Sequence, residues 1–128
     1  MSGALNWDEL RQLASRVIEG GEPLVLTEQV RGILRRTAPQ VAIGTEEAER
    51  ALNSVPDATE LLREIARRIR EGSHRLSRAL SRMYRLRDAG DLDGARQQMR
   101  DLLAVEIVPH YRDIAETSLE ALEEETKD

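Results

Sequence analysis

The clearest pattern of apolar and polar positions runs from residue 57 to residue 88. Apolar or small side chains recur there with alternating gaps of four and three residues, at Ala58, Leu62, Ile65, Ile69, Gly72, Leu76, Ala79, Met83 and Leu86. Such positions fall on one stripe of a helix with a near-heptad period. Asp57 and Glu60 fit an N-terminal capping box, and Gly90 fits a helix end. The pattern predicts one helix over residues 57–88, roughly 48 Å long.

A second helical pattern follows the turn at Gly90. Its apolar face is carried by Leu92, Ala95, Met99, Leu102, Val108, Tyr111, Ala115, Leu119 and Leu122. Pro109 removes a backbone hydrogen bond, so we expect a kink near residues 105–109. The two patterns together predict a long antiparallel helical hairpin over residues 57–128, with helices at about 57–88 and 91–123. In this hairpin Gly72 would lie opposite Ile107 and Val108 and allow the helices to approach closely.

The first 56 residues show shorter helical patterns. A capping box predicts a helix that begins at Trp7, a core residue, and ends at Gly20-Gly21. Two threonine caps open two further short helices. We interpret the apolar runs at residues 24–26 and 41–43 as extended connectors, the alternative being a two-stranded mini-ladder. The sequence thus predicts an all-α fold in one structural domain, with a small three-helix subdomain, residues 1–56, packed on the hairpin.

The hairpin would leave part of its apolar surface uncovered. Two helices side by side enclose no core, and the short N-terminal helices reach along only part of their length. Apolar side chains beside the main stripe would remain on the surface, and we take them as a candidate interface: Leu61, Leu80, Tyr84, Leu119 and Leu122. We therefore expect a homodimer in which two hairpins form a four-helix arrangement.

Composition narrows the class of protein. The chain has 128 residues, 40% hydrophobic, 34% charged and 2% aromatic, which suits one helical domain with an aliphatic core. It has no cysteine, which excludes disulfides and thiolate metal sites. No apolar run approaches the roughly 18 residues of a transmembrane helix, and the first residues lack the pattern of a signal peptide. We expect a cytoplasmic protein without a membrane partner.

Charge is unevenly distributed along the chain, although the formal net charge is −5. Residues 57–90 hold nine arginines and five acids, whereas residues 91–128 hold eleven acids and four basic residues. We expect the two helices of the hairpin to pair these charges along their flanks. Nucleic-acid binding through the arginine-rich helix 57–88 is the alternative function. The acidic chain and the lack of interleaved aromatic residues make it the less favoured one.

Candidate chemistry is sparse. Glu106 and His110 lie one turn apart, and His74 would come near Glu106 across the hairpin, so the three form a weak candidate for a metal or acid–base cluster. The favoured interpretation is structural, with Glu106 paired to Arg75 or Arg78. The chain has no glycine-rich phosphate loop, nucleophile elbow or EF-hand loop. We therefore expect no catalysis, cofactor or metal, and a module for protein–protein interaction or regulation.

Three stretches resemble a known family. They read WDELRQLASRVIEGGEPLVLTEQVRGILRRTAP, VAIGTEEAERAL and RMYRLRDAGDLDGARQQMRDLLAVEIVPHYRDIAE, and together they cover nearly the whole chain. In these stretches the chain resembles the DUSAM family, small proteins of unknown function that occur as multiple paralogues in myxobacteria. The resemblance implies a bacterial, cytoplasmic accessory protein, in which GC-rich coding favours arginine over lysine. It implies no catalytic residue, cofactor or partner.

Overall fold

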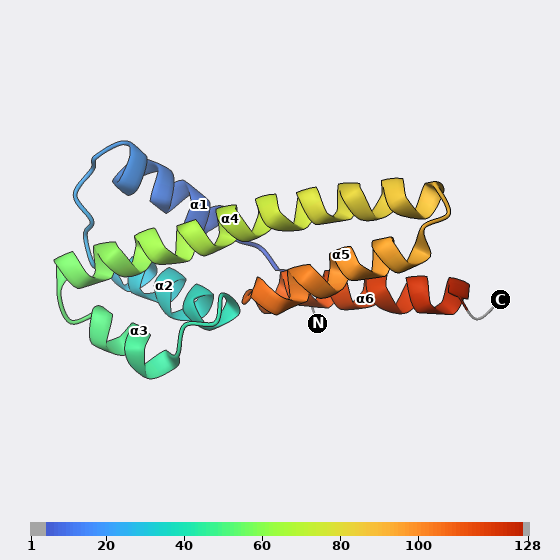
Figure 1. Cartoon of the computed structure of the whole chain (residues 1–128). Helices are drawn as coiled ribbons and strands as arrows, with labels where there is room; N and C mark the ends of the chain where they lie inside the picture. The colour runs from blue at the N-terminus through green and yellow to red at the C-terminus, as the bar shows by residue number, and fades with distance from the viewer. Residues whose placement is uncertain (1–4, 127–128) are drawn as a thin grey trace. The chain divides into compact units, whose positions relative to one another are not determined.

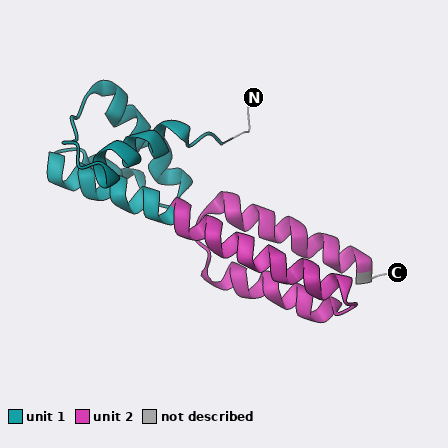
Figure 2. Ribbon diagram, turned by 90° about the horizontal axis from the view of Figure 1, so that it is seen from above, with its two compact units in different colours: residues 1–68 teal, residues 69–128 magenta. Residues whose placement is uncertain are grey.

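The computed structural model describes residues 5–126, and every regular element in this part of the chain is helical, which confirms the all-α fold. The elements in Figure 1 are α1 (Asp8–Ala14), a π-helical turn η1 (Ser15–Glu19), α2 (Glu28–Gln40), α3 (Thr45–Ala51), α4 (Val55–Asp88), α5 (Leu92–Val105) and α6 (Pro109–Thr126). None of these helices is both long and apolar enough to cross a membrane. The chain divides into two compact units, unit 1 (Met1–Arg68) and unit 2 (Ile69–Asp128), and α4 contributes to both (Figure 2).

Unit 1 has its own aliphatic core. Its largest fully buried side chains come from helices and connectors alike: Leu10, Leu34, Val41, Leu52, Leu62 and Ile65. Trp7 is buried, as predicted, and its Nε1–H donates a hydrogen bond to Gln40 Oε1 at 2.9 Å. Residues 24–26 and 41–43 form no ladder, and each run places apolar side chains under the helices. The interpretation of these runs as connectors is therefore confirmed.

The turn after α2 positions one of these connectors. The N–H of Ile43 donates to the carbonyl oxygen of Ala38 at 2.9 Å, the bond that closes a Schellman motif. Ala42 occupies the left-handed position of this turn with φ 68°, where glycine is usual. The Arg68 side chain of α4 donates to the carbonyl oxygen of Val41 at 2.9 Å. The turn is thus held against α4, which fixes the position of Ile43.

Helix α4 begins two residues before the predicted start, at Val55. The N–H of Asp57 donates to Ser54 Oγ at 3.2 Å, so Ser54 caps the helix and the predicted cap, Asp57, lies in its first turn. The end of α4 is as predicted. Gly90 adopts φ 86°, and the N–H of Asp91 donates back into the last turn of α4. The Asp91 side chain then caps α5.

The prediction of a single helix over residues 91–123 is wrong, because the chain leaves the helical path between α5 and α6. Pro109 has no N–H to donate and occupies the first position of α6, where proline is well tolerated. The Arg112 side chain donates to the carbonyl oxygens of Leu103 and Glu106 at 2.6 and 2.8 Å. These bonds satisfy acceptors that the end of α5 leaves without helical partners. The break is therefore complete, and the predicted kink becomes a reversal.

Because of this reversal, unit 2 is a bundle of three helices, made by the second part of α4 with α5 and α6 (Figure 2). At one end of the bundle the Tyr111 hydroxyl donates to the carbonyl oxygen of Ile69 at 2.9 Å. At the other end Met83 of α4 and Leu122 of α6 line the same depression. Helix α6 therefore runs in the same direction as α4. The predicted hairpin would have placed Leu122 beside the start of α4.

Gly72 lies at a close approach, as predicted, but its neighbours differ from those expected. A Cβ atom on Gly72 would lie 2.7 Å from ring atoms of Tyr111 and 2.9 Å from the carboxylate of Glu106. Ile107, one of the two expected neighbours, is 45% exposed. The Tyr111 ring is buried and its hydroxyl is hydrogen-bonded, so the ring has little room to move aside.

Substituting Gly72 with alanine should destabilise the protein, because the added methyl group would overlap the Tyr111 ring. We expect Gly72→Ala to lower the free energy of unfolding by about 1 to 3 kcal/mol in urea denaturation. Gly32 of α2 offers a matched control, since a Cβ atom there would meet nothing within 4 Å. Gly32→Ala should raise the free energy of unfolding by about 0.5 to 1 kcal/mol. Equal stabilisation by both alanines would show that α6 does not contact α4 at Gly72.

Candidate interaction site

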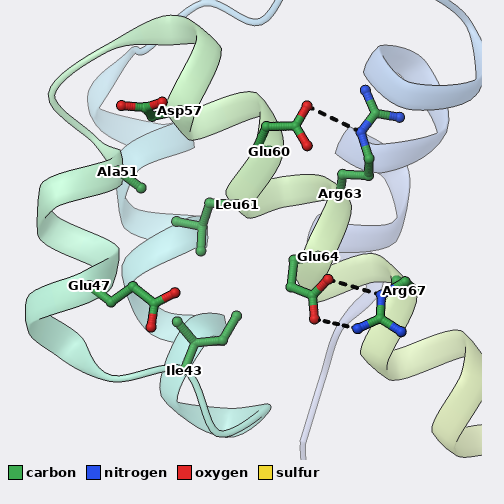
Figure 3. Close-up of a pocket in the computed structure, with 9 residues that line it drawn as sticks. All are labelled: Ile43, Glu47, Ala51, Asp57, Glu60, Leu61, Arg63, Glu64 and Arg67. Atoms are coloured by element: carbon green, nitrogen blue, oxygen red, sulfur yellow. Dashed lines mark hydrogen bonds and ion pairs between the residues drawn. The ribbon is translucent and has the colours of Figure 1, made fainter.

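An open groove of about 360 Å³ lies on unit 1, between α3 and the first turns of α4 (Figure 3). Its floor is apolar. Leu61 of α4 and Ile43 of the connector are 7% and 3% exposed, and Ala51 at the end of α3 lies beside them. The turn after α2 holds Ile43 in place, and Leu61 lies at the edge of the apolar face of α4. The groove is therefore assembled from three consecutive segments of the chain: the connector at Ile43, helix α3 and the start of α4.

Most of the groove's rim is acidic, and part of this charge is neutralised within α4. Arg63 Nε lies 3.5 Å from a Glu60 carboxylate oxygen, and an Arg67 guanidinium nitrogen lies 2.6 Å from the Glu64 carboxylate (Figure 3). Both pairs join residues three apart on the helix, a spacing that brings side chains together. Salt bridges of this exposed kind contribute little to stability, so they mainly order the side chains along one edge of the groove.

Three further acids set the charge of the rim: Glu47, Asp57 and Glu64. A hydrogen bond from Arg67 is the largest cause that lowers the pKa of Glu64, and a hydrogen bond from Arg68 also lowers it. Partial burial opposes them, and the pKa of Glu64 is about 2. The Glu64 carboxylate is therefore ionised at every physiological pH. Glu47 and Asp57 also line the groove, and their carboxylates form no ion pair with any residue in the described part of the chain. The groove thus combines an apolar floor with two carboxylates that no arginine neutralises.

The five residues of the predicted dimer interface are divided between the two units. Leu61 belongs to the floor of the groove in unit 1, and Leu122 is 2% exposed in the core of unit 2. Leu80 and Leu119 are half-buried, whereas Tyr84 is 45% exposed. The dimer was expected because the hairpin left an apolar stripe open, and in unit 2 that stripe is covered by α6. The homodimer stays a prediction, and Tyr84 is the most exposed of the five predicted interface residues.

The expectation that the charges of α4 are paired along its flanks is wrong for most of unit 2. Arg75 Nε lies 3.1 Å from Glu106 Oε1, beyond the end of α5. Four other arginines of α4 are exposed and form no ion pair within residues 5–126: Arg70, Arg78, Arg82 and Arg85. The arginine-rich helix therefore keeps an uncompensated basic face.

The candidate cluster of His74, Glu106 and His110 is a structural feature in this fold. Both histidines are exposed, whereas Glu106 is 1% exposed. The Glu106 carboxylate accepts hydrogen bonds from Arg75 Nε and from the backbone N–H of Val108, both at 3.1 Å. In the described part of the chain no group of three or more His, Asp or Glu side chains could hold a metal ion. The Glu106 carboxylate therefore holds the reversal between α5 and α6 against α4. Its partner, Arg75, is one of the two arginines that the sequence predicted for it.

Removing the arginine of this pair should cost more stability than neutralising the carboxylate. Arg75→Met leaves a buried carboxylate without its cation and should lower the free energy of unfolding by about 3 to 5 kcal/mol. Glu106→Gln keeps an oxygen that accepts the Val108 N–H, and it leaves the Arg75 side chain, 34% exposed, able to bind water. Its cost should be about 1 to 3 kcal/mol. Urea denaturation of both variants measures the difference, and the opposite order would contradict this account of the pair.

Comparison with known proteins identifies a family rather than an activity. No curated protein and no solved structure matches the chain. Residues 5–122 match the family described as "Protein of unknown function (DUF2379)", a range that begins three residues before α1 and ends in the last turns of α6. The DUSAM name and the bacterial origin stay predictions. Because the match covers both units, the chain belongs to the DUF2379 family of proteins of unknown function.

Proposed function

We propose that the chain is a non-enzymatic helical module that binds another protein through the groove of unit 1. The observation that carries this proposal is the apolar floor of Ile43 and Leu61 beside the unpaired carboxylates of Glu47 and Asp57. An apolar side chain of the partner would bury surface against the floor, while neighbouring lysine or arginine side chains would meet the carboxylates. The expected partner segment therefore carries an apolar residue flanked by basic ones.

The size of the groove limits what it can contribute to binding. Burying one large apolar side chain contributes about 1.5 to 3 kcal/mol, and each exposed ion pair adds about 0.2 to 1 kcal/mol. A micromolar complex requires about 8 kcal/mol. The partner must therefore also contact surface outside the groove, and the groove supplies the central anchor of a larger interface.

The two unpaired acids also have a local structural role. Glu47 lies in the first turn of α3 and Asp57 in the first turn of α4, where the helix dipole stabilises a negative charge by about 0.3 to 1 kcal/mol. This role explains the presence of an acid in each first turn. It does not require both acids to face one apolar groove, whereas binding of a basic segment does.

The burial of the candidate cluster's acid supports the non-enzymatic part of the proposal. Glu106, the acid of the candidate cluster, is buried and already accepts two hydrogen bonds, so it has no access to a substrate in solution. A turnover by the purified protein that disappears in His74→Ala or His110→Ala would overturn this part of the proposal.

Reversing the charge of the groove's rim should abolish binding of the partner protein. We expect the double variant Glu47→Lys and Asp57→Lys to lose, in pull-downs from native lysate quantified by mass spectrometry, the proteins that the wild type retains. The double variant Glu116→Lys and Glu120→Lys on α6 makes the same change in net charge on an exposed surface of unit 2 and should retain them. Circular dichroism checks that both variants stay helical. Equal capture by the wild type and the rim variant would rule out the groove as the binding site.

A further inference from the structure

The exposed face of α4 in unit 2 carries a line of basic side chains. Residues 72–87 contain no aspartate or glutamate. Exposed basic residues recur with gaps of four, four, four and three, a spacing that keeps them on one face of a helix, and we call them the arginine stripe: Arg70, His74, Arg78, Arg82 and Arg85. Exposed Ser77 and Ser81 lie between its members. The stripe extends over the sixteen residues 70–85, or roughly 22 Å.

Other arginines of α4 have acidic partners, so the lack of partners is specific to the stripe. In unit 2 Arg75 pairs with Glu106 at 3.1 Å, and Arg87 pairs with Asp88 at 3.5 Å. No arginine of the stripe forms an ion pair or a side-chain hydrogen bond with any residue that the structure describes. The basic face is therefore open to an external anion.

The acids of the neighbouring helices do not cancel the stripe. Helix α6 carries several exposed acids, among them Asp113, Glu116 and Glu120, but none of them pairs with an arginine of the stripe. Packed helices have axes about 8 to 10 Å apart, and the outward faces of two helices are farther apart still. At physiological ionic strength the Debye length is about 8 Å, so repulsion between these acids and an anion bound at the stripe is largely screened.

We propose that the arginine stripe binds the phosphate backbone of a nucleic-acid duplex without reading its sequence. The planar guanidinium group matches phosphate oxygens in two-point hydrogen bonds, and serine hydroxyls such as those of Ser77 and Ser81 can donate to the same oxygens. A duplex carries about one negative charge per 1.7 Å of its axis, so a straight stripe of roughly 22 Å meets several phosphates.

The stripe contains no aromatic and no large apolar side chain, and this composition favours a duplex over other anionic partners. It has no aromatic side chain on which unpaired bases could stack, which disfavours single strands. Tyr84, the exposed aromatic residue of α4, lines the depression shared with α6 instead. The arginine stripe also has no large apolar side chain to insert into a membrane, because the apolar face of α4, including Leu76 and Met83, is buried. An acidic protein surface is the remaining competitor for the stripe.

Fluorescence anisotropy with the full chain and a labelled DNA duplex of about 24 base pairs tests the proposal. The net charge of −5 places the expected dissociation constant at the weak, non-specific level, on the order of 10⁻⁴ to 10⁻⁶ M near physiological salt. With four arginines in contact, the logarithm of the association constant should fall with the logarithm of salt concentration with a slope of about −3.6. The double variant Arg78→Gln and Arg82→Gln should halve this slope and weaken binding on the order of a hundredfold at about 50 mM salt.

The matched control is Arg16→Gln with Arg50→Gln, which makes the same change in net charge at exposed positions of unit 1. It should leave the slope and the affinity as in the wild type. Thermal melting followed by circular dichroism confirms that both variants are folded. Absence of binding at low salt, equal loss of affinity in both double variants, or tighter binding of a polyglutamate peptide than of the duplex would each overturn the proposal. The last result would assign the stripe to an acidic protein surface.

Discussion

The arrangement of unit 2 depends on the buried carboxylate of Glu106. It accepts one hydrogen bond from Arg75 of α4 and one from the N–H of Val108, just before α6 begins. A buried charge is tolerated only where its hydrogen bonds and its counter-ion are supplied, and this carboxylate has both. With Pro109 opening α6, the pair fixes the point at which the chain turns back along α4. The close approach at Gly72 and the burial of Tyr111 follow from that return.

Helix α4 has opposite faces with different roles, and this explains where the candidate surfaces lie. Its apolar face is used in the cores of both units, and in unit 1 the edge of that face provides Leu61 for the floor of the groove. Its polar face is neutralised near the groove by acids of α4 itself, as in the pair between Arg67 and Glu64. In unit 2 α4 carries no acid between Glu71 and Asp88, and its polar face remains basic there. One continuous helix thus presents an acidic-rimmed groove in one unit and an arginine stripe in the other.

The sequence predicts those features of the fold that depend on neighbouring residues. The period of α4, the turn at Gly90 and the burial of Trp7 all follow from local patterns. The reversal at Glu106 did not follow, because residues 102–108 are apolar on nearly every side and Pro109 is compatible with either a kink or a new helix. The groove could not be predicted, since its three segments meet only through tertiary packing. The arginines were visible in the sequence, but their expected neutralisation depended on an unbroken second helix over residues 91–123, which the structure divides into α5 and α6.

The central claim is that α6 returns alongside the second part of α4. The chain contains no cysteine, so spin labels can be attached at Arg87→Cys and Glu125→Cys, two positions that line one depression of unit 2, and their separation measured by pulsed electron paramagnetic resonance. Neighbouring helix axes lie about 10 Å apart, so with the label arms we predict a distance below about 25 Å. In an unbroken hairpin Glu125 would lie beside the start of α4, about 48 Å from Arg87. A distance near that larger value, in samples diluted with unlabelled protein, would contradict the account.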